Sequence, residues 1–142
     1  NPTNKLIHWI CVPIILFTVF GLLMSVPFPS ILDGWVNVAT IVFTFALAFY
    51  FRLSLSIFLG MIIIGALFLI GNRFLASTIL PNIGLSLWQF SLIVFIIAWI
   101  FQFIGHKLEG QKPSFFEDVQ FLLIGPIWLL SFIYKKIGIQ YN

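Results

Sequence analysis

Hydrophobic residues dominate the chain and gather in four long stretches that contain no charged side chain. These stretches cover residues 6–32, 34–51, 53–72 and 74–106. A helix that crosses a membrane needs about 20 consecutive apolar residues, and each stretch is close to that length or longer. The pattern therefore predicts an all-α fold, a polytopic bundle of transmembrane helices. The four predicted helices lie at 7–26, 35–51, 53–71 and 85–104.

The predicted helix ends fall on residues that interrupt helices or carry charge. Pro27 and Pro29 end the first helix, since proline cannot continue one, and Asp33-Gly34 begins the second. Arg52 alone separates the second helix from the third, which predicts a tight hairpin at the membrane surface. Gly71-Asn72-Arg73 ends the third helix. The breaks thus agree with four separate helices.

A fifth apolar segment, 119–134, has 16 residues and is interrupted by Gly125-Pro126. It is short for a perpendicular span, so it is either a kinked fifth helix or a segment that does not cross. With four crossings, the face where the chain begins holds Lys5, Arg52, Lys107, Lys112, Lys135 and Lys136, against Arg73 opposite. Five crossings leave a split of only four against three. Because cytoplasmic loops carry an excess of Lys and Arg, we favour four spans plus a non-crossing segment.

We call the membrane face where the first helix begins the amino-terminal face. The charge bias predicts that this face is cytoplasmic. The membrane itself is predicted to be a bacterial inner membrane or the endoplasmic reticulum.

Composition excludes several other classes of protein. Hydrophobic residues make up 61% of the chain and charged residues 8%, with a mean hydropathy of +1.15, whereas a soluble domain has about a quarter charged residues. The net charge of +3 is scattered, so nucleic acid is not an expected partner. One cysteine excludes a disulfide framework. We expect a single integral membrane domain over residues 1–142, within a longer polypeptide because the chain opens on Asn1 without methionine.

Both histidines of the chain are predicted to lie at the amino-terminal face. His8 is near the start of the first predicted helix and His106 near the end of the fourth, and four crossings return the chain to its starting face. Each histidine has a polar neighbour at helical spacing. Asn4 precedes His8 by four residues, and Glu109 follows His106 by three, so each pair shares a helix face where the helix extends that far.

Imidazole and carboxylate groups together suit a first-row metal such as iron, and open coordination positions suit oxygen chemistry. Asn4, Asp118 or Gln120 could orient the imidazoles. The spacing leaves plainer alternatives open, because histidines near helix ends also cap carbonyl groups or contact lipid headgroups. Asp118 is also typical of the first turn of a helix. Imidazole chemistry does not separate iron from zinc.

At these two clusters the sequence resembles the membrane 2-hydroxy fatty acid dioxygenases. The motifs that carry the resemblance are Asn1-Pro2-Thr3-Asn4-Lys5-Leu6-Ile7-His8 and Gly105-His106-Lys107-Leu108-Glu109-Gly110-Gln111-Lys112-Pro113. Asp118, Gln120 and Gly125-Pro126 also resemble the tail of the family, so the similarity spans almost the whole chain. The family usually has a further histidine just before the Asn-Pro pair, and we expect that histidine to precede this sequence.

The resemblance implies an iron(II)-dependent enzyme that uses O₂ to shorten a 2-hydroxy fatty acid by one carbon, a form of fatty acid α-oxidation. It implies that His8 and His106 bind Fe²⁺. Glu109 is then a ligand, a base or a supporting group, and Asn4 and Asp118 are supporting residues. A 2-hydroxy carboxylate could bind iron through two oxygens, with its acyl tail among apolar helices and membrane lipid.

Two hypotheses from other classes remain. A non-catalytic membrane scaffold or assembly protein would use its histidines only as interfacial residues and would bind no metal. A small transporter would need polar groups near the membrane midplane. The predicted helices carry no charge at mid-depth, which makes the transporter the weakest of the three hypotheses.

Overall fold

The computed structural model describes residues 2–108, 130, 133–136 and 138, and these residues form helices without a strand. The four long helices are α1 (Pro2–Met24), α2 (Val38–Leu53), α3 (Leu55–Phe74) and α4 (Leu87–Leu108). They confirm the all-α fold and the existence of each of the four predicted helices.

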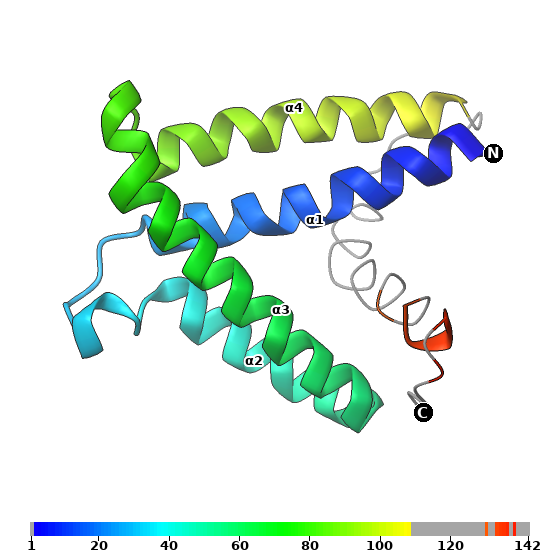
Figure 1. The fold of residues 1–142 in the computed structure, drawn as a ribbon, viewed down its shortest axis with the longest axis horizontal. Helices are drawn as coiled ribbons and strands as arrows, with labels where there is room; N and C mark the ends of the chain where they lie inside the picture. Colours follow the sequence, from blue (N-terminus) through cyan, green and yellow to red (C-terminus); the bar gives the residue numbers. More distant parts are fainter. Residues whose placement is uncertain (1, 109–129, 131–132, 137, 139–142) are drawn as a thin grey trace.

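The four helices form two antiparallel pairs (Figure 1). One pair is α1 with α4, and the other is α2 with α3. The pairs meet where α1 crosses the last turns of α3. There the rings of Phe17 and Phe20 contact that of Phe68 edge to face, at centroid distances of 5.5 and 5.6 Å. The pairs then diverge toward an open end, where the beginning of α1 and the end of α4 lie side by side at the tip of one pair and the beginning of α3 lies at the tip of the other. This end is the amino-terminal face.

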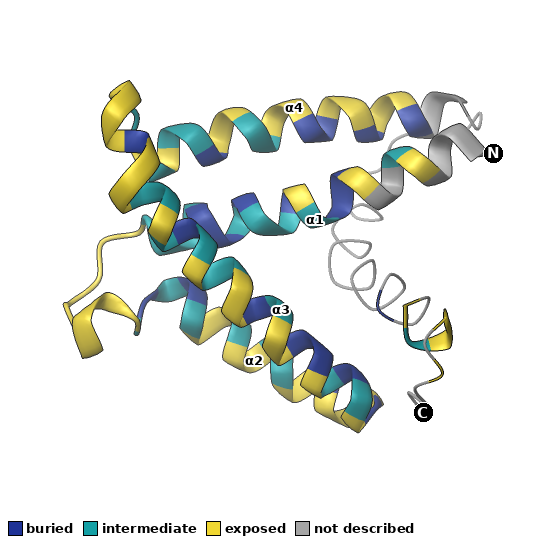
Figure 2. Cartoon of the chain, viewed as in Figure 1, coloured by how far each residue is buried: buried dark blue, intermediate teal, exposed yellow. Residues whose placement is uncertain are grey.

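Each pair has its own hydrophobic core. Between α1 and α4 the buried core residues are Cys11, Ile15, Ala98 and Trp99. Between α2, α3 and the carboxyl-terminal segment they are Tyr50, Ile57, Met61 and Leu130. Figure 2 shows buried positions on the side of α4 that faces α1 and exposed positions on its outer side. The two helices that carry the histidines therefore form one packed unit.

Two predicted helix starts are wrong, because polar caps decide them. Asp33-Gly34 lies in a 3₁₀ turn, Leu32–Gly34, and α2 begins only after Asn37. The Asn37 side chain accepts a hydrogen bond from the Thr40 N–H at 3.0 Å, as a helix N-cap does. Likewise α2 runs past Arg52, and the hairpin break is at Ser54, whose side chain caps α3.

The predicted end of the third helix at Gly71-Asn72-Arg73 is also wrong. Helical backbone continues through Phe74, a π-helical stretch (Leu75–Ile79) and a 3₁₀ turn (Leu80–Ile83), and it stops at Gly84 with φ +71°. Asn72 does not end the helix because its amide is buried inside the bundle. Its Nδ2 donates to the Phe68 carbonyl of the same helix at 2.9 Å.

Two helical stretches of the described chain are long and apolar enough to cross a membrane, Leu55–Ile83 and Leu87–Gly105. The apolar parts of the other two helices are shorter, Ile10–Met24 and Val38–Leu53. A 16-residue helix such as α2 is about 24 Å long, less than the roughly 30 Å of a hydrocarbon core. The structure thus supports two of the four predicted spans by length and composition.

The described part of the carboxyl-terminal segment packs against the beginning of α3. The Tyr134 hydroxyl donates to the Ser56 carbonyl at 2.6 Å, and Leu130 belongs to the core around Met61. Burial raises the pKa of the Tyr134 hydroxyl, so this group stays protonated and donates at neutral pH. The contact places Tyr134 at the open end of the bundle, beside the amino-terminal face.

Candidate functional site

The structure places three of the five predicted site residues in described helices. Asn4 and His8 both belong to α1, so the helix extends far enough for the two to share a face. His106 lies in the last turn of α4. Glu109 and Asp118 lie outside the described residues. The predicted roles of all five residues stay predictions.

The packing of α1 on α4 brings the two histidine positions close together. Cys11 of α1 packs with Ala98 of α4, and ten residues further along α1, Gly21 lies against Ser91. These two contacts fix how α1 and α4 are aligned, which is the α1–α4 register. With a rise of about 1.5 Å per residue, this register leaves the His8 and His106 backbones about 3–8 Å apart along the helix axes. Packed helix axes lie about 8–10 Å apart. The backbones of the two histidines therefore lie in neighbouring helical turns at one end of the bundle.

A polar junction at the other end of the pair holds this register. Asn72 of α3 is fully buried, and its Nδ2 donates to the Phe17 carbonyl of α1 at 3.1 Å. A Cβ on Gly21 would lie 2.7 Å from Asn72 Oδ1 and would collide with Ser91 Oγ. The absence of a side chain at Gly21 thus allows α1, α3 and α4 to approach one another closely.

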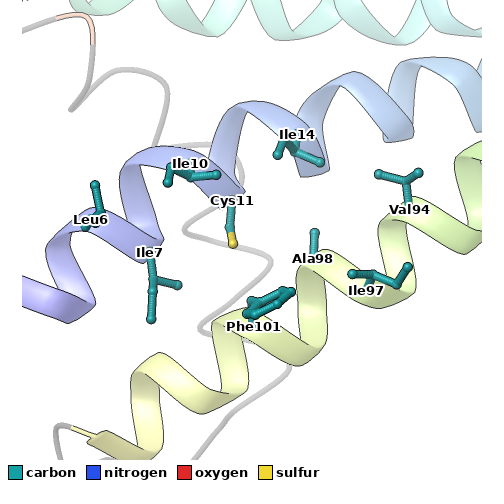
Figure 3. Close-up of a pocket in the computed structure, with 9 residues that line it drawn as sticks. All are labelled: Leu6, Ile7, Ile10, Cys11, Ile14, Val94, Ile97, Ala98 and Phe101. Atoms are coloured by element: carbon teal, nitrogen blue, oxygen red, sulfur yellow. The ribbon is translucent and has the colours of Figure 1, made fainter.

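The space next to the histidine positions is apolar. A hollow of about 380 Å³ opens between α1 and α4 (Figure 3). It is lined by Leu6, Ile7, Ile10, Cys11, Ile14, Val94, Ile97, Ala98 and Phe101. Leu6 and Ile7 directly precede His8, and Phe101 is five residues before His106. An apolar ligand in this hollow would therefore have one end near both histidine positions.

A metal ion fits the chemistry of the predicted donors, whose side chains lie outside those that the structure describes. Among the residues that it does describe, no three His, Cys, Asp or Glu residues form a group that could hold an ion. The observation in favour of a metal is the α1–α4 register, which brings two imidazole-bearing positions to one end. Imidazole nitrogen is a common ligand of iron and of zinc.

Sequence reasoning missed the hollow and the polar junction. Asn72 and Ser91 are single polar residues in apolar stretches, a signal that can mark helix contacts in a membrane. The hollow had no such signal, because its lining consists of the same residue types as the outward faces of the helices.

The protein is an apolar helical bundle in which two histidine-bearing helix ends lie side by side, next to an apolar hollow. The sequence profile of the family described as 2-hydroxy-palmitic acid dioxygenase Mpo1-like matches residues 1–137. The chain belongs to this Mpo1-like dioxygenase family, which confirms the resemblance seen in its motifs.

The chain is similar to the 2-hydroxy-palmitic acid dioxygenase MPO1 of Saccharomyces cerevisiae. It is 34% identical to this chain over 141 residues, which cover 97% of this chain and 74% of the yeast protein. No solved structure is similar to the chain.

Proposed function

We propose that the protein is an iron(II)-dependent membrane dioxygenase that converts a 2-hydroxy fatty acid into a fatty acid one carbon shorter. The observation that carries the proposal is the packing of α1 on α4, which brings His8 and His106 to one end of the bundle beside an apolar hollow. The similarity to a yeast 2-hydroxy-palmitic acid dioxygenase supports the substrate class.

The proposed reaction balances without an added reductant. The bond between C1 and C2 of the 2-hydroxy acid breaks, C1 leaves as CO₂, and C2 becomes the carboxyl carbon of the shorter acid. C2 and C1 together lose four electrons, which is the number that one O₂ accepts. The oxygen atoms of the substrate and of O₂ end in the shorter acid, CO₂ and one water.

The residues of this chain have separate roles in the proposal. His8 and His106 would hold Fe²⁺, which when bound would supply a Lewis acid for the 2-hydroxy carboxylate and redox chemistry toward O₂. Glu109 is a further ligand or a base. Asn4, one turn before His8 on the same helix face, orients the His8 imidazole by hydrogen bonding, and Asp118 has the same function for His106.

The proposal places the protein in the membrane with four spans and a carboxyl-terminal segment that does not cross. Many large apolar side chains are exposed on the outer faces, among them Phe45 (75%), Ile63 (61%) and Leu67 (61%). Water-soluble monomers rarely expose such surfaces. The Tyr134–Ser56 hydrogen bond supports a return of the segment to the amino-terminal face. The excess of Lys and Arg at this face supports a cytoplasmic location for it.

The test is turnover by the purified protein in detergent or vesicles. Iron-loaded protein should consume O₂ and form the shorter acid from 2-hydroxypalmitic acid. His8→Ala and His106→Ala should each lower both iron content and turnover. Asn82→Ala, an exposed polar change at the far end of the bundle, is the matched control and should change neither.

Full turnover in His106→Ala would refute the assignment of the site. If neither histidine variant changed iron content and the protein formed no shorter acid, the non-catalytic scaffold hypothesis would replace the enzyme. Turnover by protein that holds zinc and no iron would refute the iron-dependent reaction, because Zn²⁺ has no redox chemistry.

A further inference from the structure

Two apolar hollows on the bundle adjoin each other, and together they are called the α1–α4 groove. The hollow beside the histidine positions shares Ile14 and Val94 with a second hollow of about 500 Å³, which reaches Phe17, Phe68 and Phe90. The lining residues recur every three or four positions on both helices, as a continuous stripe on one helix face requires. The groove therefore runs along α1 and α4 from the histidine end toward the polar junction.

The groove has the length of a long acyl chain. From Leu6 to Phe17 on α1, and from Phe101 to Phe90 on α4, eleven residues correspond to about 16 Å of helix. An extended hydrocarbon chain advances about 1.25 Å per carbon, so this length holds about thirteen methylenes. The named lining residues are apolar apart from the Cys11 thiol, so the groove offers hardly any hydrogen-bond partner to a polar ligand.

Resting on the proposed function, we infer that the α1–α4 groove binds the acyl chain of the 2-hydroxy acid and sets the chain length that the enzyme accepts. The carboxylate and the 2-hydroxyl lie at the histidine end, and the methyl end points toward Phe90. Ala98 and Val94 decide the accepted chain length, because both line the groove and Val94 lies one helical turn deeper than Ala98.

A substrate chain explains this groove better than bilayer lipid does. A lipid would cover the outer face of any helix, whereas this groove is a hollow that begins beside two histidine positions. Figure 3 shows Cys11 and Ala98 pointing toward each other across the space between the helices. Both are small and nearly fully buried, with 5% and 4% of their surfaces exposed, so they form the floor of the groove, and the larger lining residues form its walls.

A pair of groove-filling variants tests the inference. Val94→Trp should block the deep part of the groove and lower turnover of 2-hydroxypalmitic acid relative to 2-hydroxyoctanoic acid by at least about tenfold, since each buried methylene contributes about fourfold in affinity. Ala98→Trp lies about 6 Å nearer the histidine end and should shorten the accepted chain by about five more methylenes. Ile96→Trp, on the exposed outer face of α4, is the matched control and should keep the unmodified preference.

Crosslinking of the unmodified protein tests the same inference without relying on catalysis or on the folding of a variant. A 2-hydroxy fatty acid with a photoreactive group near its methyl end should label α1 or α4 around Phe17 and Phe90. Excess 2-hydroxypalmitic acid should suppress this labelling, and phosphatidylcholine should not.

The outcomes separate this inference from the proposed function. Active protein with the same chain-length preference in both groove variants, or labelling confined to α2, would overturn the inference alone. Labelling of α3 near Phe68 would agree with it, because Phe68 lines the deep part of the groove. Labelling suppressed equally by phosphatidylcholine would identify the groove as a site for bilayer lipid. Protein that forms no shorter acid from any substrate, yet is labelled in the groove, would overturn the reaction and keep the acyl site.

Discussion

Replacing Gly21 by alanine should loosen the junction where α1, α3 and α4 meet. The new Cβ would lie 2.7 Å from Asn72 Oδ1 and 3.2 Å from Ser91 Cβ, and it would collide with Ser91 Oγ. Ser91 can rotate its hydroxyl away. Asn72 can give way only by moving its amide, whose Nδ2 donates to the Phe17 and Phe68 carbonyls. The substitution therefore threatens the side-chain hydrogen bond between α3 and α1.

The expected loss of stability in Gly21→Ala combines two destabilising effects with one stabilising effect. Adding a methyl group to a packed interior costs about 1–3 kcal/mol. Losing the Asn72–Phe17 hydrogen bond costs about 0.6–1.5 kcal/mol, and alanine in place of glycine in a helix returns about 0.8–1.0 kcal/mol. Gly21→Ala should therefore lower the free energy of unfolding by about 0.6–3.7 kcal/mol.

Gly71→Ala is the matched control, because it makes the same chemical change in a helix of the same bundle. There the new Cβ would meet only the Phe17 ring, at 3.1 Å, and that ring edge borders the groove and can tilt. The helix-propensity gain should then leave the variant as stable as the unmodified protein or slightly more stable. Denaturant unfolding in detergent micelles, followed by circular dichroism, measures the free energy of unfolding of Gly21→Ala and of Gly71→Ala. Equal stability of the two variants, or a larger loss in Gly71→Ala, would refute this account of the junction.

Three further substitutions probe the connections around the bundle. Tyr134→Phe removes the hydrogen bond to the Ser56 carbonyl, which contributes about 0.5–1.5 kcal/mol. Trypsin cleavage after Lys135 and Lys136 should therefore become about two- to tenfold faster. An unchanged cleavage rate would contradict docking of this segment through Tyr134. Asp33→Asn breaks an exposed ion pair with Arg73 at the other end of the bundle, where such pairs contribute little, so neither stability nor that cleavage rate should change measurably. Gly84→Ala places a Cβ in open space at a residue with φ +71°. The variant should lose about 1 kcal/mol of unfolding free energy through backbone conformation alone, and Gly84→Asn should lose less. Equal unfolding free energies for the two variants would show that the left-handed conformation does not limit this position.

The four helices were predictable because hydrophobicity alone places them. Their ends were not, because single side chains decide them. Asn37 and Ser54 set the start of α2 and α3 as N-caps, and both outweighed the charged residues nearby. Asn72 looked like a residue that ends a helix. Its burial against α1 depends on the tertiary packing of three helices, which no local pattern shows.

The grouping of the histidines at one end was predictable from the number of crossings, and the α1–α4 register agrees with it. The acyl groove was not predictable. Almost every face of these helices is apolar, so a stripe such as Leu6, Ile10 and Ile14 cannot be told from a lipid-facing one by periodicity. Only the small, buried Cys11 and Ala98 at its centre distinguish it, and their meeting requires the packed structure.

In the proposed reaction, this chain cleaves the C1–C2 bond of a 2-hydroxy fatty acid with iron and O₂. Iron-loaded protein in air, supplied with 2-hydroxypalmitic acid that carries ¹³C at C1, tests this cleavage when the products are identified by mass spectrometry. We expect ¹³CO₂ and unlabelled acid one carbon shorter in equal amounts, both absent without O₂ and both lost in His106→Ala. Shorter acid that retains ¹³C, or equal amounts of product with and without iron, would contradict it.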